Sequence, residues 1–182
     1  MRRHPGALVT KAWHQYRFHN VWLLPAPPSA VYAELARAAD YPAWWPQVRE
    51  VRAVDEGSGT ARFRSYLPYD LEVTARAVRQ DPEAGVLEIA MSGDLVGWAR
   101  WTITSVSGMG GGRRVRGMRG GPYGAEGGGT RAEFDQWVEA RKPLLRLFAL
   151  PCRPLFTANH ALMMRAGCRG LRKRLRRGLD EA

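Results

Sequence analysis

The chain has 182 residues, of which 45% are apolar and 25% charged, and its formal net charge is +11. These fractions are typical of one globular domain and exclude wholesale disorder. No apolar stretch approaches the roughly 20 residues of a membrane-spanning helix, and no secretory signal is visible, so we expect a single cytoplasmic domain over residues 1–182.

The basic residues are dominated by arginine, with 25 Arg and 3 Lys. This ratio is more typical of codon bias in a GC-rich genome than of selection for phosphate contacts, so a nucleic-acid partner is not expected. Cys152 and Cys168 lack the spacing of metal ligands, and the histidines near the N-terminus are dispersed. We therefore expect no metal and no cofactor, and we interpret both cysteines as packing residues.

The first predicted elements are a strand and a short helix. Residues 1–14 are expected to form a flexible N-terminus, and a strand follows over about residues 16–24. The prolines of the next segment, PAPPS, end this strand and favour a helix that begins near Ser29. Two further prolines predict turns around Trp44 and Trp45.

The middle of the chain predicts a run of strands joined by short turns. Leu71, Val73 and Ala75 alternate with polar residues, and so do Leu87 and Ile89. Turns this short leave no room for a crossover helix, so neighbouring strands must run antiparallel and a parallel nucleotide-binding sheet is excluded. With strands over about 96–106 and 130–141, the sheet has six or seven strands.

Residues 107–129 differ from the rest of the chain, because they contain 11 of its 20 glycines. We expect a flexible loop inserted in a hairpin, since apolar alternation resumes directly after it. The loop is either an insertion without function or a mobile lid that contacts anions. The arginines available for such contacts are Arg113, Arg114, Arg116 and Arg119.

A long helix is predicted over about residues 155–179. One arc of this helix combines Phe156, His160, Met164, Gly167, Leu171 and Leu175, and this arc should face the sheet. The opposite side carries Arg169, Arg172, Lys173, Arg176 and Arg177, which indicates a solvated face or, as the alternative, a surface for nucleic acid or acidic lipid. The fold class is therefore α+β, and a single helix about 10 Å wide forces the sheet to curl around it or to leave a hollow.

This order of elements resembles the START-like helix-grip superfamily, in particular its bacterial polyketide cyclase/dehydrase-like branch. The resemblance is carried by LPAPPSAVYAELA (24–36), YPAWWPQV (41–48), GDLVGWARW (93–101), GGTRAEFDQW (128–137) and ANHALMMRAGCRGL (158–171). The glycine-rich insertion is a departure, since a short hairpin turn is usual there. The resemblance implies a deep cavity between sheet and helix that takes lipids, sterols, aromatic polyketides or plant-hormone-like molecules, but such a fold does not choose among carriers, sensors and enzymes.

A cavity for such ligands needs apolar walls and a few polar groups that fix orientation. The candidate wall residues, each of which could equally be plain core, are Trp45, Phe63, Leu71, Val73, Ile89, Met91, Trp101, Phe134 and Met164.

His160 is the most informative polar residue, because it lies within the apolar arc of the long helix. It is either a general acid or base acting on a ligand or a structural hydrogen-bonding group. Asn159 lies nearer the edge of the arc, where a capping or helix-to-sheet hydrogen bond is favoured over a catalytic role. Tyr66 and Tyr69, at strand ends, are candidates for the rim of an opening, whereas Arg100 should face solvent.

Three functions follow from these features. The first is a carrier or sensor of a hydrophobic small molecule, lipid- or polyketide-like. The second is a polyketide cyclase, aromatase or dehydratase in which His160 and Tyr66 shuttle protons. The third is a binder of anionic surfaces or nucleic acid through the arginine-rich loop and helix end. The sequence leaves open whether the chain forms a homodimer.

Overall fold

The computed structural model of the chain describes residues 14–66, 69–106, 129–141 and 153–180. These residues form one sheet of seven antiparallel strands in the order β1-β7-β6-β5-β4-β3-β2. The strands are β1 (Gln15–Leu24), β2 (Val48–Asp55), β3 (Ser58–Arg64), β4 (Asp70–Asp81), β5 (Val86–Gly93), β6 (Leu95–Val106) and β7 (Gly129–Ala140). The helical segments are α1 (Pro28–Ala36), η1 (Ala38–Asp40), α2 (Tyr41–Trp44) and α4 (Arg153–Asp180).

The predicted α+β fold is confirmed. Strands β2 to β7 form an antiparallel meander, and β1 pairs with β7, so the first and last strands along the chain are neighbours in the sheet. The prolines after β1 begin α1, as their fixed backbone angle favours. The predicted glycine-rich loop lies outside the described residues except for Gly129, and the predicted flexible N-terminus except for His14.

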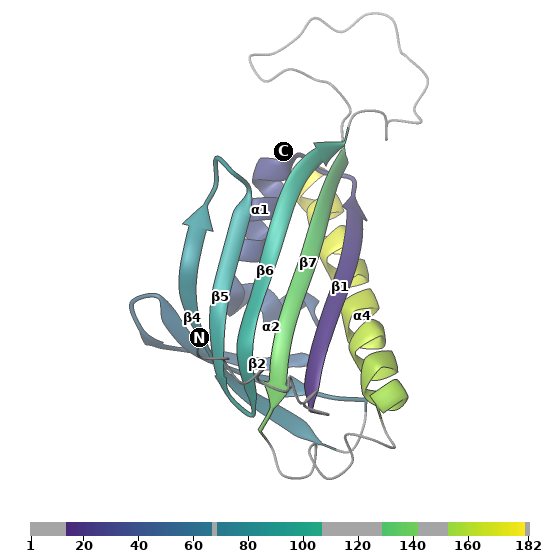
Figure 1. The fold of residues 1–182 in the computed structure, drawn as a ribbon. Coiled ribbons are helices and arrows are strands. Elements are labelled where there is room, and N and C mark those ends of the chain that lie inside the picture. The colour runs from purple at the N-terminus through teal and green to yellow at the C-terminus, as the bar shows by residue number, and fades with distance from the viewer. Residues whose placement is uncertain (1–13, 67–68, 107–128, 142–152, 181–182) are drawn as a thin grey trace, which may run out of the picture.

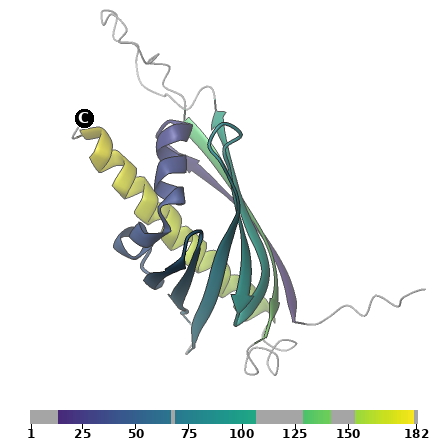
Figure 2. The same cartoon turned by 90° about the vertical axis from the view of Figure 1, so that its left-hand side faces the viewer.

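The sheet curves, and α4 crosses its concave side (Figures 1 and 2). The helix α1 contacts β6, β7 and α4, and α2 contacts β2 and α4. Strands β2 and β3 turn across the lower end of the sheet in Figure 1. The α1–η1–α2 segment therefore covers part of the concave side that α4 alone leaves open.

The predicted apolar arc of α4 faces inward, because Met164, Gly167, Leu171 and Leu175 are buried and His160 is half-buried. The five basic residues predicted on the opposite side are all exposed. One further arginine, Arg174, pairs with Glu34 of α1 and Asp40 of η1 and so ties the helix to the segment beside it.

Two glycines let α4 lie directly against the Trp44–Trp45 pair. A Cβ atom on Gly170 would fall 1.7 Å from the carbonyl oxygen of Trp44, and one on Gly167 would fall 2.5 Å from Cε2 of Trp45. The indole Nε1 of Trp45 donates a hydrogen bond to the carbonyl oxygen of Met163, at 3.0 Å. Side chains at either glycine would force the helix away from this contact.

We expect Gly170→Ala to destabilise the protein, although the same change in a free helix is stabilising by up to about 1 kcal/mol. The clash is with backbone, which cannot rotate away, so a loss of about 2 kcal/mol in the free energy of unfolding is expected in urea titrations. Gly178→Ala is the matched control in the same helix, because nothing lies within 4 Å of its added Cβ. Equal stability changes in the two variants would show that the close approach does not hold in solution.

Candidate functional site

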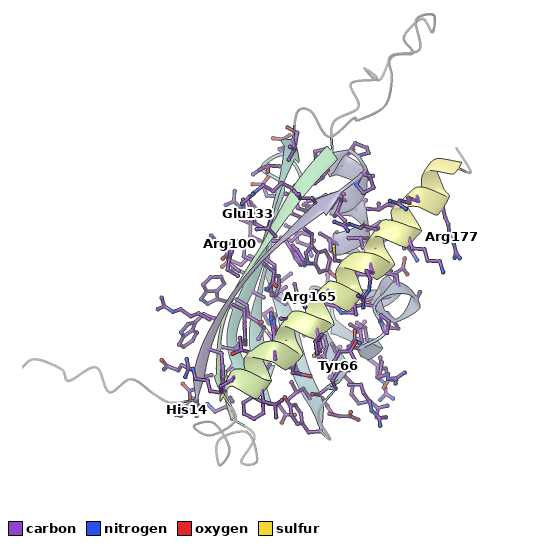
Figure 3. The ribbon with its side chains drawn as sticks, turned by 90° about the vertical axis from the view of Figure 1, so that its right-hand side faces the viewer. His14, Tyr66, Arg100, Glu133, Arg165 and Arg177 are labelled. Atoms are coloured by element: carbon purple, nitrogen blue, oxygen red, sulfur yellow. The ribbon has the colours of Figure 1, made fainter. Side chains whose placement is uncertain are left out.

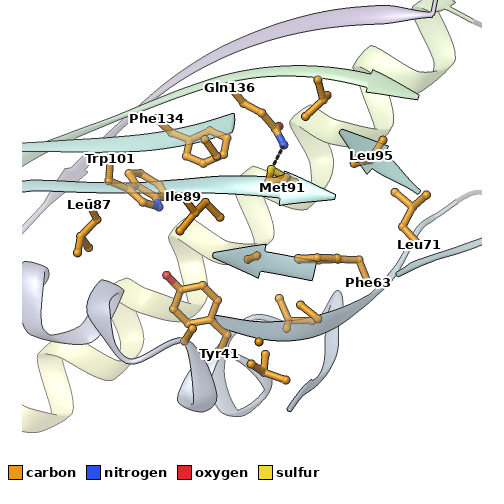
Figure 4. A pocket seen from close by; sticks show the side chains of 18 of the residues that line it. Tyr41, Phe63, Leu71, Leu87, Ile89, Met91, Leu95, Trp101, Phe134 and Gln136 are labelled. Atoms are coloured by element: carbon orange, nitrogen blue, oxygen red, sulfur yellow. Dashed lines mark hydrogen bonds between the residues drawn. The ribbon is translucent and has the colours of Figure 1, made fainter. Parts of the chain in front are cut away.

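A cavity of about 540 Å³ lies between the concave face of the sheet, α4 and the α1–η1–α2 segment. Its wall is mostly apolar and rich in aromatic rings (Figure 4). The rings of Trp101 and Phe134 lie 4.8 Å apart between centroids, and Trp22 packs edge-on against Trp101 at 4.7 Å. The strands supply this wall because every second side chain of a strand points to the same face.

Most of the predicted site residues meet on this wall. They are Trp45, Phe63, Tyr69, Leu71, Ile89, Met91, Trp101, Phe134, Asn159, His160 and Met164. Trp45 directly follows α2 and Tyr69 directly precedes β4, and the others come from strands β3 to β7 and from α4. Segments more than 100 residues apart in the sequence therefore contribute to one cavity.

Val73, predicted to be either cavity wall or plain core, does not line the cavity. It points to the same face as Leu71 and Ala75, which do line it. Its side chain is only 2% exposed, because the surrounding core side chains bury it. Val73 is therefore core and not wall.

The structure places Tyr66, the predicted partner of His160 in proton transfer, away from the cavity wall. Tyr66 follows the end of β3, is 56% exposed and is absent from the cavity wall. Its hydroxyl accepts a hydrogen bond from Nε2 of Gln47, at 2.7 Å. Figure 3 shows Tyr66 beside α4, on the surface of the molecule. Tyr69 does line the cavity, together with Tyr16 and Tyr41, and burial raises the pKa of the Tyr69 phenol.

Asn159 is buried and connects α4 to the segment between β3 and β4. Its Oδ1 accepts hydrogen bonds from the Ser65 hydroxyl, at 3.0 Å, and from the backbone N–H of Tyr66, at 2.9 Å. This is the helix-to-sheet connection that the sequence favoured. These two hydrogen bonds hold α4 in place. They also occupy Oδ1 of Asn159, so this oxygen does not accept a hydrogen bond from a ligand.

His160 lies in the interior end of the cavity. Its ring stacks on Phe18, with centroids 3.7 Å apart, and its Nε2 lies 3.2 Å from Oε1 of Gln136. An amide oxygen only accepts hydrogen bonds, so Nε2 carries the proton in this pair. Burial lowers the pKa of His160 to about 4, and its imidazole is therefore neutral at pH 7.

Gln136 is the functional candidate that the sequence analysis missed. Its Oε1 faces His160, and its Nε2 donates to the sulfur of Met91 at 3.6 Å (Figure 4). The available signal was the inward face of β7, where Gln136 is the polar residue between Phe134 and Val138. A buried polar side chain inside an apolar alternation indicates either a structural hydrogen bond or a site.

The charged residues of the cavity wall are Arg52, Asp55, Arg79 and Glu88. The side chains of Arg52, Asp55 and Arg79 are at least half exposed, at 74%, 50% and 51%, so they belong to the mouth. Each is paired with an opposite charge outside the wall, as is Glu88.

Arg100 faces solvent as expected and pairs with Glu88, at 2.7 Å (Figure 3). Cys168 packs half-buried against the core, and burial raises the pKa of its thiol. Cys152 lies outside the described residues. Across the described ranges, no three His, Cys, Asp or Glu side chains are grouped as a metal site would need, and no helix is long and apolar enough to cross a bilayer.

Comparison with known proteins gives a family match over most of the chain. The family model described as "Polyketide cyclase / dehydrase and lipid transport" matches residues 24–155. A search of curated proteins finds no match.

Several solved structures share the fold. The ZhuI aromatase/cyclase of a Streptomyces strain is 14% identical with a TM-score of 0.64, covering 91% of this chain and 96% of that one. A START superfamily protein from Mycobacterium smegmatis is 14% identical with a TM-score of 0.59, covering 88% and 97%. The di-domain aromatase/cyclase BexL, from the BE-7585A biosynthetic pathway, is 16% identical with a TM-score of 0.58, covering 91% of this chain and 52% of that one.

We expect His160 to make the stability of the protein fall in mild acid. In the unfolded state His160 takes up a proton near pH 6.5, whereas in the folded state it does so only near pH 4. The contribution of neutral His160 to the free energy of unfolding is therefore fully present above pH 6.5 and is lost as the pH falls from 6.5 to 4. The loss in unfolding free energy between pH 7 and pH 5 is about 2 kcal/mol, measurable by urea titration.

The control is His160→Gln, which removes this titration but keeps the histidines that pair with Glu139 and Asp135. The wild type should lose about 2 kcal/mol more than this variant over the same pH interval. Parallel pH profiles would show that His160 is not buried in solution.

Proposed function

Because the chain belongs to the polyketide cyclase/dehydrase and lipid transport family, we propose that it binds a hydrophobic small molecule, lipid- or polyketide-like, as a carrier or sensor. The observation that supports this most directly is the cavity of about 540 Å³ with its largely apolar wall. Ligand sites of drug-sized molecules have volumes of roughly 300–1,000 Å³ and the same composition of many apolar and few polar groups.

The walls of the cavity favour flat or chain-like apolar ligands. Trp101 and Phe134 contribute aromatic rings to the wall, and Met91 and Met164 contribute flexible side chains that adapt to a guest. Desolvating such a guest is the driving force for binding, at about 25 cal/mol per Å² of apolar surface buried.

The state of His160 favours binding over catalysis. A general base works best when its pKa lies near the working pH, and the pKa of His160 is about 4. A base this weak removes protons slowly, and its protonated form is nearly absent at pH 7. The neutral imidazole is better suited to orienting a polar neighbour than to proton transfer.

A second candidate function is catalysis of the cyclase, aromatase or dehydratase type. It is supported by the position of His160 on the cavity wall, where its Nδ1 has no hydrogen-bond partner among the described residues. In this function Nδ1 removes a proton from the carbon next to a ligand carbonyl, and the bond electrons move toward the carbonyl oxygen. Tyr66 has no part in it, because its side chain is exposed.

A cytoplasmic location stays part of the proposal. Its support is the free thiol of Cys168, which a reducing compartment maintains. Homodimer formation and binding of anionic surfaces remain predictions from the sequence.

We expect Ala99→Phe to weaken binding of the uncharged fluorophore N-phenyl-1-naphthylamine about tenfold or more, because the new ring occupies part of the cavity. Fluorescence titration measures this affinity. The matched control is Ala90→Phe on the adjacent strand, where the side chain is exposed and outside the cavity wall. If the wild type does not bind the fluorophore, or both variants bind it like the wild type, the cavity is not the binding site.

The enzyme alternative is tested by proton exchange on a simple ketone, 2-acetylnaphthalene, in heavy water. Catalysis predicts deuterium entry into the acetyl methyl group at least 100-fold faster than in the His160→Gln variant, measured by NMR. The rate should fall only as pH drops through about 4, since the base must be unprotonated. Tyr66→Phe is the control and should exchange like the wild type. Exchange no faster than in buffer would contradict the catalytic function and leave binding intact.

A further inference from the structure

The interior end of the cavity contains one amide whose donor side lacks a strong partner. Gln136 is buried, and its Oε1 is taken by Nε2 of His160. Its Nε2 therefore points the other way, and its partner among the described residues is the sulfur of Met91, at 3.6 Å. A thioether sulfur is a weak acceptor, so this amide N–H is incompletely satisfied.

A ligand oxygen would be a better partner for this N–H than sulfur. Gln136 and Met91 both lie on the cavity wall, so a guest can reach the amide without any change in the fold (Figure 4). With Oε1 of Gln136 on His160, the Nε2 side of the amide is the one that faces Met91. The cavity is thus prepared to donate one hydrogen bond to an acceptor on an otherwise apolar guest.

Within the part of the chain that the structure describes, no cationic side chain lies beside Gln136 to neutralise a ligand charge. Among the described residues of the wall, the cationic side chains are Arg52 and Arg79, both exposed and already paired with Glu50 and Asp81. Bringing a carboxylate to Gln136 would therefore remove it from water without a counter-charge, which is costly. Burial already keeps His160 neutral in the same place.

We infer that the cavity selects uncharged, largely apolar ligands with a neutral carbonyl oxygen that accepts a hydrogen bond from Nε2 of Gln136, and that it rejects the corresponding carboxylates. Gln136 is then a specificity-determining residue, and His160 is the residue that positions it. This inference rests on the proposed binding function and specifies its ligand class.

The experiment compares three probes of nearly equal size at pH 7 by isothermal titration calorimetry. They are 2-acetylnaphthalene, with a neutral carbonyl, 2-ethylnaphthalene, with no oxygen, and 2-naphthoate, with a carboxylate. The ketone should bind about fivefold more tightly than the hydrocarbon, which corresponds to one neutral hydrogen bond. The carboxylate should bind at least tenfold more weakly than the ketone.

Two variants assign the preference to residues. Gln136→Leu keeps the apolar wall and removes the donor, so ketone and hydrocarbon should bind equally. His160→Phe keeps a ring that can stack on Phe18 but frees the amide, so the preference for the ketone should shrink while hydrocarbon affinity stays the same. The matched control is Gln80→Leu, an exposed glutamine at the mouth of the same cavity, which should retain the full preference.

The outcomes separate this inference from the proposed function. If none of the three probes and no other hydrophobic guest binds, the binding function itself fails. If the hydrocarbon binds but the ketone gains nothing, or the carboxylate binds as well as the ketone, the inference on ligand class is wrong and the binding function stands. The wild-type comparison needs no variant, so a misfolded Gln136→Leu protein would not prevent this decision. Loss of the preference in Gln80→Leu would place oxygen recognition at the mouth and overturn the role of Gln136.

Discussion

The concave face of the seven-stranded sheet is wider than one helix can cover, and this mismatch governs the rest of the structure. A helix with its side chains is about 10 Å across, whereas neighbouring strands are about 4.8 Å apart. The sheet curves around the helix, and the α1–η1–α2 segment lies beside α4 (Figure 2). The covering is still incomplete, and the remaining space is the cavity of about 540 Å³.

A hollow of this kind persists only if the helix is held at a fixed distance from the sheet. At its C-terminal half, α4 rests on the Trp44–Trp45 pair through Gly167 and Gly170. At its N-terminal half, Asn159 connects it to the segment that follows β3. Both attachments lie beside the cavity, so they keep the helix from collapsing into it. Side chains that line the cavity lack packing contacts on the side that faces it, and a bound guest can supply those contacts.

The chemistry of the interior follows from the same geometry. Burial keeps His160 neutral, and its hydrogen bond with Oε1 of Gln136 leaves Nε2 of the amide facing Met91. The charged side chains of the wall stand at the mouth, where solvent and opposite charges stabilise them. An apolar cavity with one oriented hydrogen-bond donor is better suited to binding a ligand than to transferring protons.

The sequence by itself determined the strands, their antiparallel connection, the inward arc of α4 and the family, because periodicity and turn length act locally along the chain. It did not determine which of the inward-facing side chains reach the cavity. Val73 and Leu71 share a face, yet only Leu71 reaches the cavity, and Tyr66 lies outside it altogether. The pairing of His160 with Gln136 was decided only by tertiary structure, because these residues belong to different elements whose separation depends on how far the sheet bends. Alternation predicts which way a side chain points, and packing decides what it meets there.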